Sequence, residues 1–185
     1  MKHLTLLLLL CSCGGGTSLP PTDTIQVNLV AVSPSTEDEM VETFKAAAEQ
    51  YQVQLGITLE AASITQVTDP SPNVTSLSDR ERKFDVLGVL ARGGITYIYA
   101  GPLYKDGVSY KTGKSTGGCR SGYAVGFHKP NHPHNVGLMM HELGHLLGAN
   151  HTHDDSVMSG ALPAGTNQWF SGESVLEIGG CLGGR

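Results

Sequence analysis

The sequence predicts a single α/β domain, and three stretches carry that prediction. Residues 24–32 alternate apolar and polar side chains, which is the pattern of a β-strand. A stripe of apolar residues at helical spacing follows from Met40 to Tyr51, and residues 136–147 are apolar on nearly every side, as in a buried helix. A chain of 185 residues is long enough to bury the core that such elements need.

The first strand and the first helix are the most clearly defined elements. Ile25, Val27 and Leu29 lie on one face of the strand. Thr36 and Glu39 stand three residues apart in a capping-box pattern, which predicts that the helix begins at this point. The core-facing stripe of that helix consists of Met40, Phe44, Ala47 or Ala48, and Tyr51.

Further strands and a closing helix follow in order. Apolar or alternating character predicts strands at 57–64, 84–91, 95–101 and 122–128. The tail predicts a helix from about 172 to 178, with Ser171 as its N-cap and Gly179 at its end. The order is therefore strand, helix, three or four strands, helix, loop and helix.

Residues 1–13 have the character of an export signal rather than of a folded element. Lys2 supplies a positive charge, and an apolar run from Leu4 to Leu10 follows. The run continues into Leu-Cys-Ser-Cys, a pattern that resembles a bacterial lipobox with Cys13 as the lipidated residue. A plain secretory signal with incidental cysteines is the alternative, and both alternatives predict an exported chain.

This division gives three regions: the signal at 1–13, a tether at 14–23 and the domain at 24–185. The tether contains glycines and two prolines, which are typical of flexible or extended linkers. We therefore expect a bacterial lipoprotein anchored in the outer membrane or at the cell surface, with a secreted protein as the alternative. The net charge of −5 does not favour binding to nucleic acid. Neither a calcium site nor an oligomeric state follows from the sequence.

The most informative stretch is HELGHLLGANH, residues 141–151. His141 and His145 are four residues apart, so a helix projects both side chains from one face, where they can bind the same zinc ion. Gly148 allows the helix to end in a left-handed residue, after which the chain turns back and brings His151 to the metal. The predicted cofactor is one Zn²⁺ ion with these three histidines as ligands.

Glu142 indicates that this zinc site is catalytic rather than structural. Three protein ligands leave the fourth position of a tetrahedral zinc ion open for water, whereas a structural site is closed by a fourth cysteine or histidine. The Glu142 carboxylate is placed to take a proton from that water and to pass it to a leaving amine. A chance match to the five fixed positions is expected in about one chain in 10⁵ of ordinary composition.

HELGHLLGANH followed by SVMSG, residues 156–160, resembles the metzincin zinc peptidases. The resemblance implies that Met158 lies in a methionine-containing turn beneath the metal and supports the site without binding the ion. It also implies a metzincin-like catalytic domain, with a twisted mixed β-sheet of four to five strands, an active-site helix, the Met-turn and a C-terminal helix. The implied activity is that of a zinc endopeptidase with Glu142 as general base.

Upstream segments most resemble the reprolysin (adamalysin) branch of the metzincins. GITYIYAGPLY resembles its edge strand, and GYAVGFH resembles the strand that follows. By this resemblance, a protein or peptide substrate lies extended along residues 95–101, and residues 159–170 form the wall of the pocket just after the scissile bond. Reprolysins have Asp after the third histidine, whereas this chain has Thr152, which is closer to the pappalysin branch, so the branch stays open.

Cys119 and Cys181 are the cysteines of the domain, and each stands among glycines. A lone pair of cysteines in an exported protein usually forms a disulfide. The resemblance agrees, because reprolysins connect the corresponding loop to the C-terminal segment. We therefore predict a disulfide between Cys119 and Cys181.

The remaining candidates have simpler interpretations. We expect His128, His132 and His134 to be surface histidines, with a second metal site as the alternative. Asp154 is expected to order the loop after the third ligand, with orientation of a ligand histidine as the alternative. A function of another class is a surface lipoprotein that keeps zinc but acts as a binding or adhesion module, and the presence of Glu142 argues against it.

Overall fold

The computed structural model describes residues 24–69, 94–101, 103–105, 108–111, 113–160 and 166–183. The predicted signal and tether, with Cys13, and the predicted strand at 84–91 lie outside these ranges. The strands are β1 (Thr24–Val32), β2 (Thr58–Val67), β3 (Ile95–Ala100), β4 (Leu103–Lys105), β5 (Val108–Lys111), β6 (Gly113–Gly117) and β7 (Gly122–Phe127). The helices are α1 (Glu37–Leu55), α3 (Asn135–Leu146) and α4 (Gly172–Gly183).

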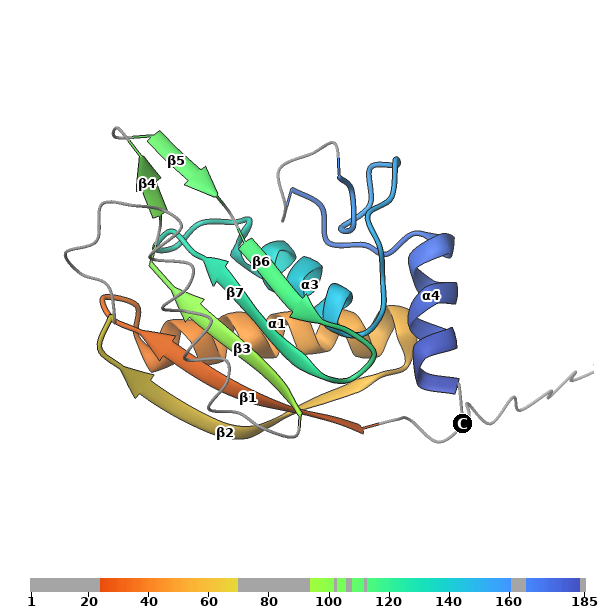
Figure 1. The fold of residues 1–185 in the computed structure, drawn as a ribbon, viewed down its shortest axis with the longest axis horizontal. Coiled ribbons are helices and arrows are strands. Elements are labelled where there is room, and N and C mark those ends of the chain that lie inside the picture. The colour runs from red at the N-terminus through yellow and green to blue at the C-terminus, as the bar shows by residue number, and fades with distance from the viewer. Residues whose placement is uncertain are drawn as a thin grey trace, which may run out of the picture.

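Five strands form one mixed sheet in the order β2-β1-β3-β7-β6 (Figure 1). The pairs β1–β2, β1–β3 and β3–β7 are parallel, and β6 runs antiparallel to β7. β4 and β5 pair with each other as a separate two-stranded sheet. The predicted α/β architecture, with four to five strands in a mixed sheet, is therefore confirmed.

The expected position of the edge strand is wrong. Residues 95–100 form β3, which lies between β1 and β7 and is buried along its whole length. The edge next to β7 is β6, in a glycine-rich segment where the sequence pattern indicated no strand. The segment GKSTG lacks the alternating apolar residues that mark a half-buried strand, so its pairing with β7 defines it instead.

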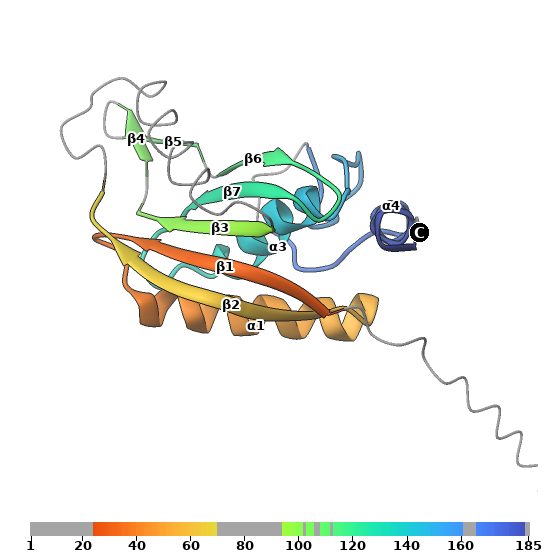
Figure 2. The ribbon, with the colours of Figure 1, turned by 60° about the horizontal axis from the view of Figure 1, so that its bottom comes forward.

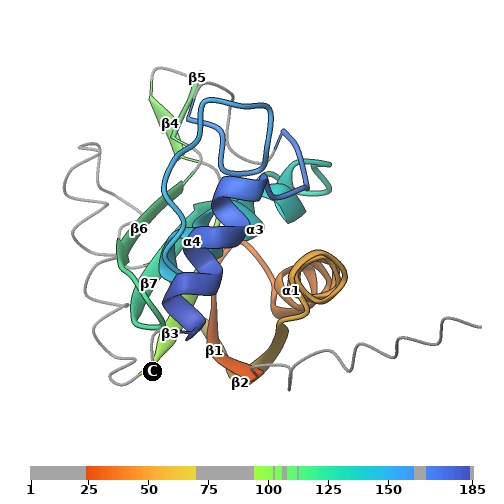
Figure 3. The ribbon, with the colours of Figure 1, turned by 90° about the vertical axis from the view of Figure 1, so that its right-hand side faces the viewer.

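α1 and α3 cover one face of this sheet, as Figures 2 and 3 show. α1 packs against β1 and β2, whereas α3 packs against β6, β7 and α1. The main hydrophobic core lies between the helices and the sheet and includes Val27, Leu29, Met40 and Leu143. Among the described helices, none has both the length and the apolar character needed to cross a membrane.

α1 begins where its sequence predicts. Thr36 Oγ1 accepts the Glu39 amide at 3.2 Å and the Glu39 carboxylate accepts the Thr36 amide at 3.1 Å, so the predicted capping box is present. Gly56 ends the helix with a left-handed φ of 67°. The buried Tyr51 donates its hydroxyl proton to the Met140 carbonyl at 2.8 Å, which fixes α1 against α3.

α4 begins as predicted but continues further. The Ser171 hydroxyl accepts a hydrogen bond from the Ser174 amide at 3.3 Å, as an N-cap does. The predicted end at Gly179 is wrong, because the helix runs to Gly183. Leu182 packs against the main core, and this tertiary contact holds the last turn despite the glycines that weaken it.

The predicted disulfide between Cys119 and Cys181 is confirmed. It connects the turn between β6 and β7 to the last turn of α4. Next to it, the Arg120 amide donates to the carbonyl of Leu146 at 2.9 Å, at the end of α3. The disulfide and this hydrogen bond therefore tie the turn between β6 and β7 to α4 and to the end of α3.

Replacing both cysteines, as Cys119→Ser with Cys181→Ser, should lower the free energy of unfolding by roughly 4 kcal/mol, since the bridge closes a loop of 62 residues. Urea unfolding of the wild type and of the double variant measures this difference. Wild-type protein kept in reductant is the control and should resemble the variant. Equal unfolding midpoints for the oxidised wild type and the variant would contradict the expectation.

Candidate metal centre

α3 carries the HELGH segment and brings it under the edge of the sheet. Its apolar residues pack into the main core, so the helix has little freedom to shift. The helix ends at Leu146, and Gly148 follows with a φ of +97°, a left-handed backbone that residues with side chains rarely adopt. The chain reverses at this glycine and returns His151 to the helix face that carries His141 and His145.

The Nε2 atoms of the three histidines converge on one point. They are 3.2 Å apart for His141 and His145, 3.1 Å for His145 and His151, and 3.3 Å for His141 and His151. A tetrahedral zinc ion with bonds of about 2.0–2.1 Å has its ligand atoms about 3.3 Å apart. The spacing therefore fits one tetrahedral ion with three protein ligands. Within the described ranges, no other group of His, Cys, Asp and Glu side chains shows such convergence.

Backbone carbonyls orient two of these rings. Nδ1 of His141 donates to the Val157 carbonyl at 2.7 Å, and Nδ1 of His145 donates to the Ala149 carbonyl at 2.8 Å. Because a carbonyl can only accept, each neutral ring carries its proton on Nδ1 and a lone pair on Nε2. Burial lowers the pKa of His141 to about 4 and also lowers the pKa of His145, so both rings are neutral near pH 7.

The donor set therefore fits a cation. Two nitrogen lone pairs that face each other across 3.2 Å repel, and a positive ion between them removes that repulsion. Neutral imidazole nitrogen is a preferred ligand of zinc. The hydrogen bonds from the Nδ1 atoms to carbonyls are the outer contacts that usually fix the orientation of such ligands.

Glu142 lies beside the histidines and beneath the edge strand. Its side chain is 3% exposed. A Cβ atom on Gly113 of β6 would lie 2.8 Å from Glu142 Cγ and would overlap the carboxylate. Only glycine at position 113 leaves room for the carboxylate where it stands.

Met158 packs beneath α3. It is fully buried, and a Cβ atom on Gly144 would lie 2.6 Å from its sulfur, so the glycine of HELGH lets the thioether rest directly on the helix. The carbonyl of Met158 accepts the Thr152 amide at 2.9 Å, which closes the turn. Since Val157 of this turn also holds the His141 ring, the turn supports the metal centre through the backbone as well as through the methionine.

Thr152, which departs from the reprolysin pattern, orders the same turn. Its buried hydroxyl donates to Asp154 Oδ1 at 2.7 Å, and the Ser156 amide donates to the same oxygen at 2.9 Å. Hydrogen bonds from Ser156 and Thr152 lower the pKa of Asp154 to about 2. Asp154 therefore orders the loop, as expected.

α4 holds the segment between Gly148 and His151 from outside. Glu177 accepts the Asn150 amide at 2.8 Å and the Asn150 side chain at 2.6 Å, and these bonds lower the pKa of the Glu177 carboxyl. A Cβ atom on Gly148 would lie 2.9 Å from Cβ of Cys181, so the disulfide passes close to the turn. α4 and its disulfide thus brace the loop that presents His151.

The expectation that His128 lies at the surface is wrong. The residue is 1% exposed, and burial lowers its pKa to about 3. His128 is the first residue after β7, and its side chain points toward the helices. There the ring contacts the rings of Tyr97 and Tyr99 of β3. His132 and His134 are partly exposed and contact each other edge to face, with ring centroids 4.7 Å apart.

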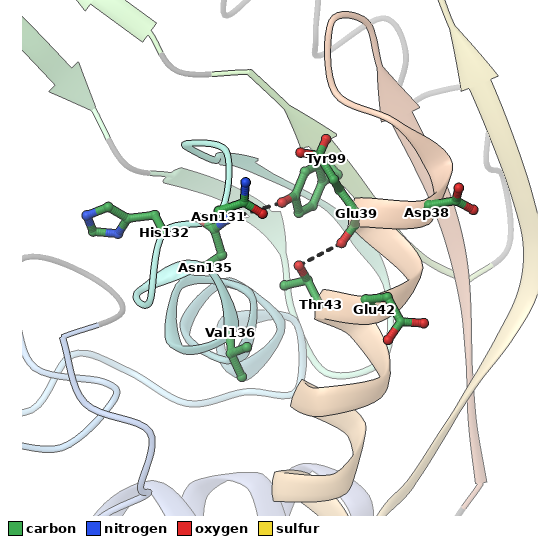
Figure 4. Close-up of a pocket in the computed structure, with 9 residues that line it drawn as sticks. All are labelled: Asp38, Glu39, Glu42, Thr43, Tyr99, Asn131, His132, Asn135 and Val136. Carbon is green, nitrogen blue, oxygen red and sulfur yellow. Dashed lines mark hydrogen bonds between the residues drawn. The ribbon is translucent and has the colours of Figure 1, made fainter.

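A pocket of about 450 Å³ lies between the first turns of α1 and the loop before α3 (Figure 4). Three carboxylates, Asp38, Glu39 and Glu42, make one side of it acidic. Tyr99 and His132 belong to its lining, but none of the three converging histidines does. The pocket is therefore separate from the metal centre.

Sequence reasoning missed three parts of the centre. The carbonyls of Val157 and Ala149 carry no sequence signal, because every residue has a carbonyl group. Gly113 lies in a segment for which the sequence pattern predicts no strand. What marks Gly113 is that it pairs with another glycine, Gly126, across β6 and β7. This pairing can be recognised only when the register of the two strands is known.

Comparisons with known proteins agree with this geometry. A reprolysin family model described as metallo-peptidase family M12 matches residues 22–172. No curated protein sequence matches the chain at a significant level.

Two solved structures are similar in fold. Metalloproteinase-II from Bacteroides fragilis aligns with a TM-score of 0.61 at 13% identity, over 89% of this chain and 55% of that one. Archaemetzincin from Methanopyrus kandleri aligns with a TM-score of 0.67 at 18% identity, over 89% of this chain and 99% of that one. The chain thus spans little more than half of the first structure and nearly all of the second. At these identities the similarity concerns the fold.

The fold, the three-histidine centre and the family model lead to the same class, a metzincin-like zinc peptidase, which the sequence predicted. The match extends over most of the domain, from before β1 to the start of α4. The chain belongs to metallopeptidase family M12.

Proposed function

We propose that the chain is a zinc-dependent endopeptidase in which His141, His145 and His151 hold one zinc ion and Glu142 acts as general base. The observation that carries this proposal is the convergence of three Nε2 atoms, 3.1–3.3 Å apart, beside a buried carboxylate. Membership of a peptidase family supports a protein or peptide as substrate.

The residues of the centre have separate roles in this proposal. The three histidines would hold a zinc ion, which when bound would supply Lewis-acid chemistry by polarising the scissile carbonyl and lowering the pKa of a water. Glu142 accepts a proton from the attacking water as the new C–O bond forms, and gives it to the leaving amine as the C–N bond breaks. Its enclosure between α3 and Gly113 keeps the carboxylate in one position during both transfers. Val157 and Ala149 keep two of the imidazole rings directed at the ion.

We propose that the substrate lies extended along β6 rather than along residues 95–101. β6 ends the sheet on the side of the metal centre and contacts Glu142 through Gly113. The outer side of an edge strand offers N–H and C=O groups that an extended peptide can pair with. The segment 159–170 stays our candidate for the wall of the pocket after the scissile bond, and its residues 161–165 lie outside the described residues.

A non-catalytic binding module is the alternative function. Such a module would keep the three histidines for stability, but it has no need for a carboxylate fitted beneath an edge-strand glycine. The close packing of Glu142 on Gly113 therefore favours the enzyme.

We also propose that the protein is a bacterial lipoprotein with Cys13 lipidated, residues 14–23 as tether and the domain at the outer membrane or cell surface. The Leu-Cys-Ser-Cys pattern and the glycine and proline residues after it support this localisation. A secreted form is the alternative.

Glu142→Ala should retain about one zinc ion per chain and the fold, yet lose hydrolysis by at least roughly 10²-fold, because a general base typically contributes 10²- to 10⁴-fold. Metal analysis and cleavage of a fluorescence-quenched peptide library, with and without chelator, measure both properties. Cleavage at the wild-type rate would refute the proposed mechanism.

His151→Ala should lose both zinc and activity, because two imidazoles bind zinc more weakly than three. Equilibrium dialysis against zinc compares its affinity with that of the wild type, and His153→Ala, an exposed histidine two residues further on, is the matched control. If the His151 variant binds zinc as tightly as the wild type, the proposed ligand set is wrong.

Gly113→Ala should reduce kcat/KM by about 10²-fold at unchanged zinc content, because the new methyl group displaces the Glu142 carboxylate. Gly118→Ala, a few residues further along, is the control, since its Cβ would meet only the His145 carbonyl at an ordinary 3.8 Å. Equal activity of the two variants would contradict the proposed fit between β6 and Glu142.

Cys13→Ser should move the protein from the membrane fraction to the soluble fraction, because an acyl chain supplies the membrane affinity. Cys11→Ser is the matched control and should stay with the membranes. A Cys13 variant that still sediments with membranes would argue against lipidation at this residue.

A further inference from the structure

A buried polar pair, Tyr97 and His128, lies behind Glu142 and has no part in the mechanism described above. The Tyr97 hydroxyl and His128 Nε2 are 2.9 Å apart, at hydrogen-bonding distance. Tyr97 is fully buried and His128 is 1% exposed. Burying two polar side chains in a hydrophobic core costs free energy unless they are hydrogen-bonded, and here they bond to each other.

The His128 ring is held in a fixed orientation. It stacks on the Tyr99 ring with centroids 3.8 Å apart and an angle of 5° between the planes. The Tyr99 hydroxyl accepts a hydrogen bond from Asn135 at 3.3 Å, at the wall of the pocket in Figure 4. The His128 amide also donates to the Ala100 carbonyl at 2.8 Å, so ring and backbone are both fixed to β3.

Two paired glycines bring this pair close to Glu142. Gly113 and Gly126 are directly opposite each other in β6 and β7, so the positions of their missing side chains are on the same face. A Cβ atom on Gly113 would overlap the Glu142 carboxylate, and a Cβ atom on Gly126 would overlap the Tyr97 hydroxyl and the His128 ring. The carboxylate and the hydroxyl thus occupy neighbouring spaces that the two glycines leave open.

The electrostatics agree with this proximity. Burial raises the pKa of Tyr97 well above its usual value, and the charge of Glu142 raises it further. Tyr97 therefore keeps its proton. Burial also keeps His128 neutral, because its pKa is lowered to about 3. A neutral imidazole that donates from Nε2 to the tyrosine oxygen leaves the tyrosine O–H free to turn toward a carboxylate.

We propose that Tyr97, oriented by His128, is a positioning residue that directs its hydroxyl at the Glu142 carboxylate and holds it in line with the attacking water. This inference rests on the proposed role of Glu142 as general base. Tyr97 transfers no proton and touches neither substrate nor metal. Its effect is to restrict the carboxylate to one rotamer, in addition to the packing of the carboxylate against Gly113.

The test uses Tyr97→Phe, which removes one hydroxyl from the full-length protein and leaves the ring. The variant should keep its zinc content and KM but lose roughly 10- to 100-fold in kcat on a fluorescence-quenched peptide, the usual range for a hydrogen bond to a charged group. His128→Leu should lose kcat in the same way. His128→Gln, which retains an N–H donor near the position of Nε2, should recover most of that loss.

Tyr51→Phe is the matched control, because Tyr51 is equally buried and also bonds to α3, through the Met140 carbonyl. It should lower the unfolding temperature without lowering kcat. A second readout needs no metal and is the ¹³C chemical shift of the Glu142 carboxyl carbon in zinc-free protein. The signal is assigned by its absence from the spectrum of Glu142→Gln. Its chemical shift should change in Tyr97→Phe and should not change in Tyr51→Phe.

The outcomes separate this inference from the proposed function. If Tyr97→Phe keeps both the wild-type kcat and the Glu142 signal, Tyr97 is only a core residue and the inference is overturned. If Glu142→Gln itself cleaves the peptide at the wild-type rate, the proposed function is wrong, and the inference that rests on it falls with it. Loss of activity in Glu142→Gln with full activity in Tyr97→Phe leaves the proposed function intact and removes only the positioning role.

Discussion

Three imidazole nitrogens held 3.1–3.3 Å apart are the constraint on which the rest of the site depends. Neutral rings with lone pairs directed at one another repel, so the chain has to hold them together by other contacts until a cation binds. The carbonyls of Val157 and Ala149 hold two of the rings. Glu177 of α4 braces the loop that presents the third, His151. The Met-turn, the left-handed turn at Gly148 and the disulfide-linked helix are therefore parts of one support.

The edge of the sheet meets a second requirement, which is to bury a carboxylate beside these rings. Gly113 and Gly126 are paired across β6 and β7 and leave a space above α3 that no side chain of the two strands fills. Glu142 occupies the space at the first glycine, and the Tyr97–His128 pair occupies the space at the second. The strand that we propose for docking an extended substrate thus also limits the position of Glu142, the proposed general base.

The parts of the site that could be predicted from sequence are those with local causes. The spacing of His141 and His145 on a helix and the left-handed glycine after it determine where the ligand side chains point. β6 could not be predicted, because GKSTG has no apolar alternation and becomes a strand only through its pairing with β7. The burial of His128 depends on rings from β3, and the length of α4 depends on packing beyond Gly179, so both expectations from local pattern were wrong.

The central claim is that one zinc ion is held by the three converging histidines, and anomalous diffraction at the zinc absorption edge from crystals of the zinc-loaded protein tests it most directly. The account predicts one strong anomalous peak, about 2.0–2.1 Å from each Nε2 atom of His141, His145 and His151. A fully zinc-loaded protein with its anomalous peak elsewhere, or bonded to fewer than these three nitrogens, would contradict it.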